Sequence, residues 1–172
     1  NETAETTSAK VLTTTKDRSI GVLNALETAN IKPADISVLV HGTTTATNAL
    51  VERKYPPVAM ITTDGFRDVI EIGRQRRQHL FALREKHAEP IVPRRLRFTL
   101  ECRLSAQGED IRPFDETEAR RVAREIKAQG IRSVAICFIN AYVDGRHEEQ
   151  MRDILLAEHP DCHVALSAET VK

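Results

Sequence analysis

Apolar residues in the first part of the chain follow two alternating patterns, one typical of strands and one typical of helices. Short apolar or β-branched runs predict strands over residues 10–15, 36–40 and 58–62. Helical spacing predicts helices after the candidate cap Asp17, through 46–50 and over 66–72. The run at 36–40 has no polar interruption larger than a serine, so we expect a central strand covered on both faces.

The second part of the chain continues the alternation after a less regular stretch. Residues 74–97 are rich in Arg and His, and prolines interrupt them, so we expect a connecting excursion with one helical turn at 80–83. Strict apolar and polar alternation over 96–104 predicts a half-exposed strand. Asp115 and Glu118 form a capping box for a helix. Later runs predict a strand over 133–139, a helix over 147–159 and a strand over 163–166.

The order of these elements predicts an α/β domain. Strands that alternate with helices require right-handed crossovers, which produce a largely parallel sheet flanked by helices. Ligands of such sheets bind beyond the carboxyl ends of the strands. This rule directs attention to the loops at 41–48 and 62–66.

Composition and charge exclude several classes of protein. The chain has 172 residues, of which 41% are hydrophobic and 29% charged, with no apolar run long enough to span a membrane. Basic and acidic residues both number 25, so no net field attracts nucleic acid. The three cysteines show no disulfide or zinc spacing, and with no signal peptide they favour the cytoplasm. We expect residues 1–9 to be a disordered or vector-derived start.

The candidate chemistry is concentrated where the chain leaves the run at 36–40. His41, Gly42 and a series of threonines precede a helix, and Gly42 allows the backbone to approach a ligand closely. With the first amides of a helix, these groups can hold a phosphate or a developing oxyanion. A structural alternative remains open, in which one threonine caps the helix, the others bond to local backbone and His41 is a hydrogen-bonded core residue.

Other polar clusters carry weaker signals. Thr62 to Gly65 is foremost a turn, and the arginines at 74–77 could clamp an anion or lie in solvent. The metal-friendly side chains at 159–163 are interrupted by Pro160, so no metal site is expected. The chain has no glycine-rich nucleotide loop of the Walker type and no serine-hydrolase elbow.

Two long motifs resemble one known family. The segment from His41 to Lys54, HGTTTATNALVERK, is similar to the HGTT-x-ATNALLERK segment of hydantoinase A proteins. The segment from Ile61 to Gln75, ITTDGFRDVIEIGRQ, continues the match, and shorter matches at 92–94, 108–109 and 135–138 follow in the family's order. The resemblance covers residues 10–172, which correspond to the family's N-terminal domain, with parts at 10–73, 74–97 and 98–172.

This resemblance implies an actin-like (ribonuclease H-like) ATPase-type fold with a mostly parallel mixed sheet, incomplete at its N-terminal hairpin. It also implies an ATP- and Mg-dependent hydrolase that phosphorylates a cyclic amide before ring opening, as N-methylhydantoinases and oxoprolinases do. A subunit of an acetone- or acetophenone-type carboxylase and a non-catalytic interaction domain are the alternatives. The hairpin with the family's phosphate loop should precede Lys10, so we expect the chain alone to be inactive.

If the corner at 41–48 lies at the ligand edge of the sheet, this chemistry gives roles to the candidate residues. His41, Thr43 and Thr44 are expected to be catalytic. Residues expected to bind nucleotide or substrate are Gly42, Thr45, Thr47, Asn48, Arg74 and Gln75. The basic clusters at 74–77 and 94–97 are alternatively expected to dock a hydantoinase B-type subunit. Family members carry His-Ser where this chain has Asn140 and Ala141, so the role of that histidine is not transferred.

Overall fold

The computed structural model describes residues 6–14, 16–74 and 89–170. The chain divides into two compact units, Asn1–Thr47 and Asn48–Lys172, and helix α2 (Thr45–Val51) crosses the boundary. The first unit contains α1 (Arg18–Thr28) and the 3-10 turn η1 (Pro33–Asp35). The side chain of Asp17 accepts a hydrogen bond from the backbone nitrogen of Ser19 at 2.9 Å, which confirms the predicted cap of α1.

The two strands predicted for the first unit are wrong. Residues 10–14 and 36–40 form no strand, and residue 15 lies outside the described part. Val38, Leu39 and Val40 are 78%, 60% and 89% exposed. A strand is stabilised by backbone hydrogen bonds to a neighbouring strand, and no described segment pairs with either run. The apolar pattern alone therefore does not make these residues form a strand.

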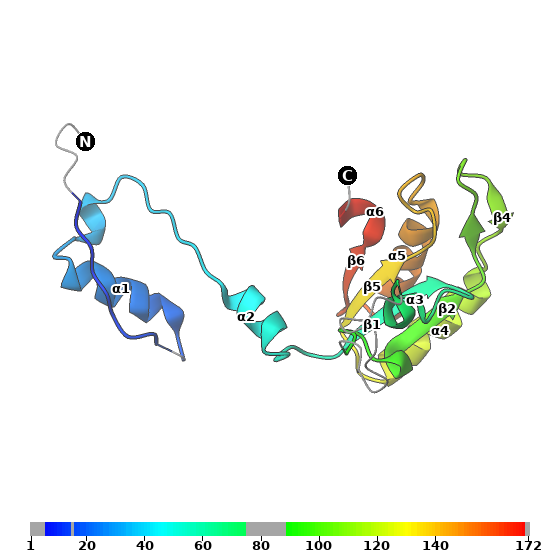
Figure 1. Ribbon diagram of the computed structural model, residues 1–172, viewed down its shortest axis with the longest axis horizontal. Coiled ribbons are helices and arrows are strands. Elements are labelled where there is room, and N and C mark those ends of the chain that lie inside the picture. The colour runs from blue at the N-terminus through cyan, green and yellow to red at the C-terminus, as the bar shows by residue number, and fades with distance from the viewer. Residues whose placement is uncertain (1–5, 15, 75–88, 171–172) are drawn as a thin grey trace, which may run out of the picture. The chain divides into compact units, whose positions relative to one another are not determined.

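The second unit is built on a four-stranded sheet (Figure 1). Its strands are β1 (Val58–Thr63), β2 (Arg97–Leu100), β5 (Ser133–Cys137) and β6 (His163–Leu166). Their order is β2-β1-β5-β6, and every pair is parallel. A small antiparallel pair, β3 (Arg103–Leu104) and β4 (Asp110–Arg112), accompanies this sheet. The predicted α/β class with a mostly parallel sheet is confirmed.

Helices follow the strands much as the sequence predicts. Helix α4 (Glu116–Ala128) begins at Asp115, whose carboxylate accepts hydrogen bonds from the amides of Thr117 and Glu118. Helix α5 (Arg146–Glu158) is followed by β6 and by a short helix that was not predicted, α6 (Ser167–Thr170). Helix α3 (Val69–Ile72) is shorter than the predicted helix over 66–72, because the residues after β1 form turns in which Gly65 has a φ of 84°.

One face of the sheet carries the core of the second unit. In-register apolar residues of this face are Ala59, Ile61, Val134, Ile136 and Leu166. They belong to one buried cluster with residues of the two long helices, which are Ala119, Val122, Ala123, Ile126, Met151, Ile154 and Leu155. In Figure 1, α4 and α5 cover this sheet. Among the described residues, no helix is long and apolar enough to cross a membrane.

The alternating stretch over 96–104 differs from the prediction in two respects. It forms a short 3-10 turn η2 (Arg94–Leu96), then β2 and β3, with a break at Glu101 and Cys102. Its apolar positions are buried as predicted, but Arg97 is buried too, with 2% of its surface exposed. The helical turn predicted over 80–83 lies outside the described residues.

Candidate anion-binding site

A cavity of about 310 Å³ lies within the first unit. Its walls are the segment 11–14, the first half of α1, and the two motif residues His41 and Thr43. Helix α1 packs closely against the segment 11–14. The backbone nitrogen of Gly21 donates to the hydroxyl of Thr14 at 3.0 Å, and a Cβ on Gly21 would lie 3.1 Å from that hydroxyl. The cavity is therefore lined both by the motif residues His41 and Thr43 and by the segment 11–14, which lies much earlier in the chain.

Arg18 is the cationic group of this cavity. It is the first residue of α1, so the cap at Asp17 fixes its backbone, and its guanidinium donates to the hydroxyl of Thr45, 27 residues away in the chain. The hydroxyls of Thr43 and Thr45 lie 2.7 Å apart. A guanidinium, two hydroxyls and an imidazole in one place are donors that suit phosphate or carboxylate oxygens.

The structure brings together some of the predicted site residues. His41 and Thr43 line the cavity and Thr45 bonds to Arg18 and to Thr43. His41 is exposed, so the alternative of a buried core histidine is wrong. The amide of Thr45 donates to the hydroxyl of Thr43 at 3.3 Å, which agrees with the alternative that a threonine satisfies local backbone. Bonding to local backbone does not prevent Thr43 from contacting a ligand in the cavity, because a hydroxyl has two lone pairs and a proton.

The remaining predicted residues lie outside the cavity wall. Gly42 and Thr44 are exposed, and Thr47 and Asn48 lie within α2. Arg74 is exposed after α3 in the second unit, and Gln75 lies outside the described residues. Sequence reasoning missed Arg18, because nothing in its own segment distinguishes it from a surface arginine on a helix.

The basic cluster at 94–97 is largely occupied by ion pairs. The guanidinium of Arg97 donates to Glu71 at 2.9 Å, to Asp68 at 3.4 Å and to the carbonyl of Val92 at 2.9 Å. Arg94 donates two hydrogen bonds to Asp68, at 2.9 and 3.0 Å, and these bonds lower the pKa of that carboxyl. The expectation that the whole cluster faces a partner is therefore wrong for Arg97, which instead anchors α3 to the start of β2.

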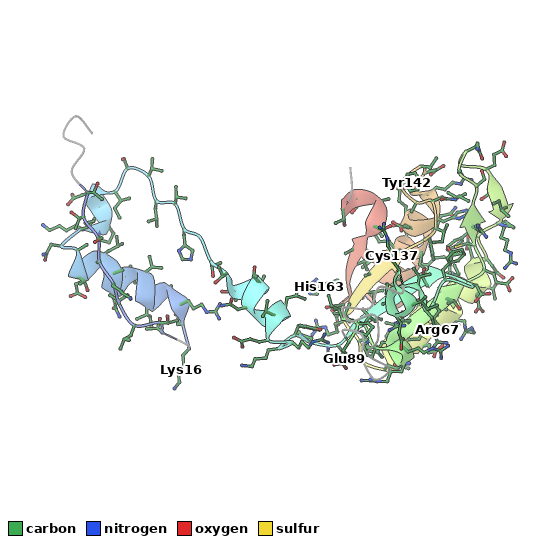
Figure 2. All side chains as sticks on the ribbon, viewed as in Figure 1. Lys16, Arg67, Glu89, Cys137, Tyr142 and His163 are labelled. Atoms are coloured by element: carbon green, nitrogen blue, oxygen red, sulfur yellow. The ribbon has the colours of Figure 1, made fainter. Side chains whose placement is uncertain are left out.

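A buried carboxylate organises the carboxyl edge of the sheet. Glu148, in the first turn of α5, is 0% exposed. It accepts hydrogen bonds from the amide of Phe138 at 2.9 Å, the hydroxyl of Ser167 at 2.6 Å and the amide of Ala168 at 2.9 Å. These donors follow β5 and β6 directly, so one side chain fixes both loops. Figure 2 shows Cys137 at the carboxyl end of β5 and Tyr142 beyond it, with His163 where β6 begins.

Neighbouring groups add to this organisation. The amide of Ile139 donates to the hydroxyl of Thr63 at 3.1 Å, and the side-chain amide of Asn140 donates to the carbonyl of Leu104 at 2.8 Å. Asn140 has a φ of 64°, a left-handed conformation that asparagine tolerates better than most residues. Burial raises the pKa of Cys102 to about 12, so this thiol stays protonated.

His147, next to Glu148, makes stability depend on pH. Its ring is 5% exposed, and Nε2 lies 2.9 Å from a carboxylate oxygen of Asp110. Burial lowers the pKa of His147 below its usual value of 6.5, and the attraction of Asp110 only partly opposes it. The unfolded chain therefore binds a proton at His147 more tightly than the folded chain does. As a result, the contribution of neutral His147 to the free energy of unfolding is complete above about pH 6.5 and is lost as the pH falls toward the lower pKa of the folded state.

We expect the free energy of unfolding to fall by less than about 1.4 kcal/mol per pH unit from this group below pH 6.5. Urea titrations at pH values on both sides of 6.5 measure it. His147→Gln should remove part of the slope, whereas His163→Gln, at an exposed position on β6, should leave the slope unchanged. An identical slope in all three proteins would contradict the assignment.

Known proteins share both the sequence and the fold of this chain. Residues 1–159 match the family described as the hydantoinase/oxoprolinase N-terminal region. An uncharacterised protein of Methanocaldococcus jannaschii is 41% identical over 85% of this chain and 22% of its own length. The acetophenone carboxylase gamma subunit of Aromatoleum aromaticum is 30% identical over 91% of this chain and 24% of its own length.

A solved structure agrees with these matches. The ATP-dependent caprolactamase from Pseudomonas jessenii superposes with a TM-score of 0.77 at 26% identity, over 96% of this chain and 26% of its own. The chain thus spans about a quarter of the length of these proteins. The motifs at 41–54 and 61–75 lie inside the region that matches, and the chain belongs to the hydantoinase/oxoprolinase family as its N-terminal region.

Proposed function

We propose that this chain is the N-terminal region of an ATP-dependent enzyme that opens cyclic amides, in the manner of the hydantoinases and oxoprolinases. The cavity that brings Arg18 and Thr45 to His41 and Thr43 is the observation that carries the proposal. These donors suit the oxygens of a phosphoryl group. The similarity to an ATP-dependent caprolactamase, whose name describes a cyclic-amide hydrolase, supports the choice of substrate.

Phosphorylation solves a specific chemical problem. An amide carbon is a poor electrophile, and transfer of a phosphoryl group from ATP to the amide oxygen, with release of ADP, activates that carbon toward water. Water then adds to the carbon, the C–N bond of the ring breaks as the nitrogen takes a proton, and hydrolysis of the acyl phosphate releases a carboxylate and phosphate. In this proposal Arg18 neutralises charge that develops on the phosphoryl oxygens. Thr43 and Thr44 donate hydrogen bonds, and His41 orients or polarises the reacting oxygen. Gly42, Thr47, Asn48, Arg74 and Gln75 remain proposed binding residues.

The side chains that line the cavity suit the phosphate groups of ATP better than they suit a magnesium ion. No carboxylate is found among the described residues that line it, so Mg, in our proposal, is held by the phosphates of ATP and by groups elsewhere in the protein. We also propose assembly with a hydantoinase B-type subunit and a cytoplasmic location. The three unpaired cysteines suit a reducing compartment.

A carboxylase subunit is the second candidate, because a relative that covers most of this chain is named as the gamma subunit of an acetophenone carboxylase. Both candidates use ATP to activate an oxygen, and they differ in the second reactant, which is water for a hydrolase and bicarbonate for a carboxylase. A non-catalytic interaction domain is a third reading and predicts no response to nucleotide.

The decisive assay uses a protein of the relatives' full length, with its partner subunit. Our proposal predicts ADP release that depends on a cyclic amide and not on bicarbonate. ADP release that requires a ketone and bicarbonate would favour the carboxylase. Calorimetric titration of the 172-residue chain with Mg-ATP, beside the same titration of the full-length protein, completes the test. We expect binding by the longer protein alone, and binding by neither would favour the interaction domain.

A further inference from the structure

Arg103 and Arg67 are the two arginines among the described residues whose Nε is buried without a hydrogen-bond partner. Arg67 still donates from Nη2 to the carbonyl of Arg94 at 3.0 Å, whereas the described residues accept no hydrogen bond from the guanidinium of Arg103. Eight other arginines among the described residues of this unit lie within ion-pair distance of carboxylates: Arg53, Arg94, Arg97, Arg120, Arg121, Arg124, Arg146 and Arg152. Buried polar groups without a partner are rare in folded proteins, and each requires an explanation. Arg112, which pairs across the strands with Arg103, is exposed, so solvent can reach its guanidinium.

The guanidinium of Arg103 is nevertheless held in place. Its central carbon lies 5.3 Å from the centre of the Phe66 ring, a cation–π contact. Its backbone is fixed by the pairing of β3 with β4. Stacking on a ring orients the planar group without using its N–H donors. The fork is thus positioned in advance, with hydrogen-bonding capacity left over.

The position of this pair in the fold is one where ligands bind. Phe66 lies in the turn after β1, and Arg103 follows the end of β2, the neighbouring parallel strand. Both residues therefore stand at the carboxyl edge of the sheet, the edge at which ligands bind in open parallel sheets. Asp64 and Gly65 of the same turn are exposed, so solvent reaches this edge.

Nearby carboxylates do not neutralise Arg103. Asp64 and Glu101 are the acidic residues of the two segments that carry the pair, and both are exposed. Asp144 and Glu148 line the same small pocket as Arg103, but Asp144 pairs with Arg146, and Glu148 accepts hydrogen bonds from two amides and a hydroxyl. None of these four carboxylates forms an ion pair with Arg103 within the described part of the chain. The charge of the guanidinium is thus available to a group from outside the protein, and two parallel N–H donors match two oxygens of one oxyanion.

We propose that Arg103, stacked on Phe66, binds the oxyanion of a small ligand, a carboxylate or a phosphate group, at the carboxyl edge of the second unit. This site is built from residues of the second unit, and the proposal does not rest on the proposed function. Failure to bind oxyanions would leave the amide-hydrolase proposal unaffected, since that proposal depends on the first unit.

Nuclear magnetic resonance of the arginine Nε–Hε groups tests this proposal on the 172-residue chain. Sodium acetate and inorganic phosphate are titrated separately, with sodium chloride at matched ionic strength as the reference salt. We expect the Arg103 resonance, identified by its loss in Arg103→Gln, to shift with saturation in acetate or phosphate and not in chloride. The salt with the lower dissociation constant identifies the oxyanion as carboxylate or phosphate.

Matched variants separate binding from folding. Arg112→Gln removes the same charge from the opposite strand and should leave the dissociation constant unchanged. Phe66→Leu keeps the guanidinium and removes the ring, and should weaken binding roughly two- to fivefold. An Arg103 resonance that does not saturate, that responds equally to chloride, or that is as sensitive to Arg112→Gln as to Phe66→Leu would overturn the proposal.

Discussion

Replacing Glu148 with alanine should lower the free energy of unfolding of this chain by about 3 to 5 kcal/mol, the range observed when one partner of a buried polar cluster is removed. The change leaves three donors without their acceptor, two of which are backbone amides that cannot rotate away. Because Glu148 is 0% exposed, water reaches these donors only if the loops after β5 and β6 open. Urea unfolding, followed by circular dichroism, measures the loss.

The neighbouring residue provides a matched control for this prediction. Glu149 lies in the same turn of α5 and is exposed, so Glu149→Ala should change the free energy of unfolding by no more than about 0.5 kcal/mol. Glu148→Gln should be intermediate, because an amide accepts hydrogen bonds through only one of its two polar atoms. Equal stability of the Glu148 and Glu149 alanine variants would show that the three hydrogen bonds contribute nothing net.

In a protein of the relatives' full length, Arg18→Gln and Thr43→Val should each reduce kcat roughly 100-fold, the usual cost of removing one donor that stabilises developing charge. Arg18 supplies the cavity's cation, and Thr43 supplies a hydroxyl in its wall. Steady-state measurement of ADP release gives kcat and KM separately. A change confined to KM would mean that these residues bind the ground state and the transition state equally.

Lys16 provides the control for the lost charge. Lys16, labelled in Figure 2, is exposed and lies two residues before Arg18. It is not among the residues that line the cavity. Lys16→Gln removes one positive charge from the same segment and should leave kcat within about twofold of the unchanged protein. If Arg18→Gln and Thr43→Val also stay within twofold, the cavity is not where the reaction occurs.

Local patterns predicted the second unit well, because its elements are determined by nearby residues and by a buried face. Asp115 caps α4 as predicted, but Glu118, the other residue of the predicted capping box, accepts hydrogen bonds from Arg121 instead of from the amide of Asp115. The alternation over 96–104 identifies the apolar positions that face the core. The break at Glu101 and Cys102 was not predictable. It depends on where β1 ends, since the amide of Asp64 donates to the carbonyl of Leu100 and ends the ladder there.

The errors concern properties that depend on distant residues. The run at 36–40 has the composition of a buried strand, but its burial requires a partner that no local pattern specifies. Arg97 occupies a position that alternation assigns to solvent, and it is buried because Glu71 and Asp68 come from another segment. Arg18 and Glu148 were missed for the same reason. Their significance comes from Thr45 in one case and from two loop amides in the other.

The strand order also has a consequence for synthesis on the ribosome. β1 pairs with β2 and with β5, and both lie later in the chain. At typical elongation rates, roughly 4 to 15 s separate completion of β1 from completion of β5. During that interval a six-residue strand, fully buried in the finished fold from Ala59 to Thr63, has at least one unpaired edge. Such an edge can pair with other nascent chains, so we expect β1 to be an aggregation-prone strand of this unit until residue 137 has emerged.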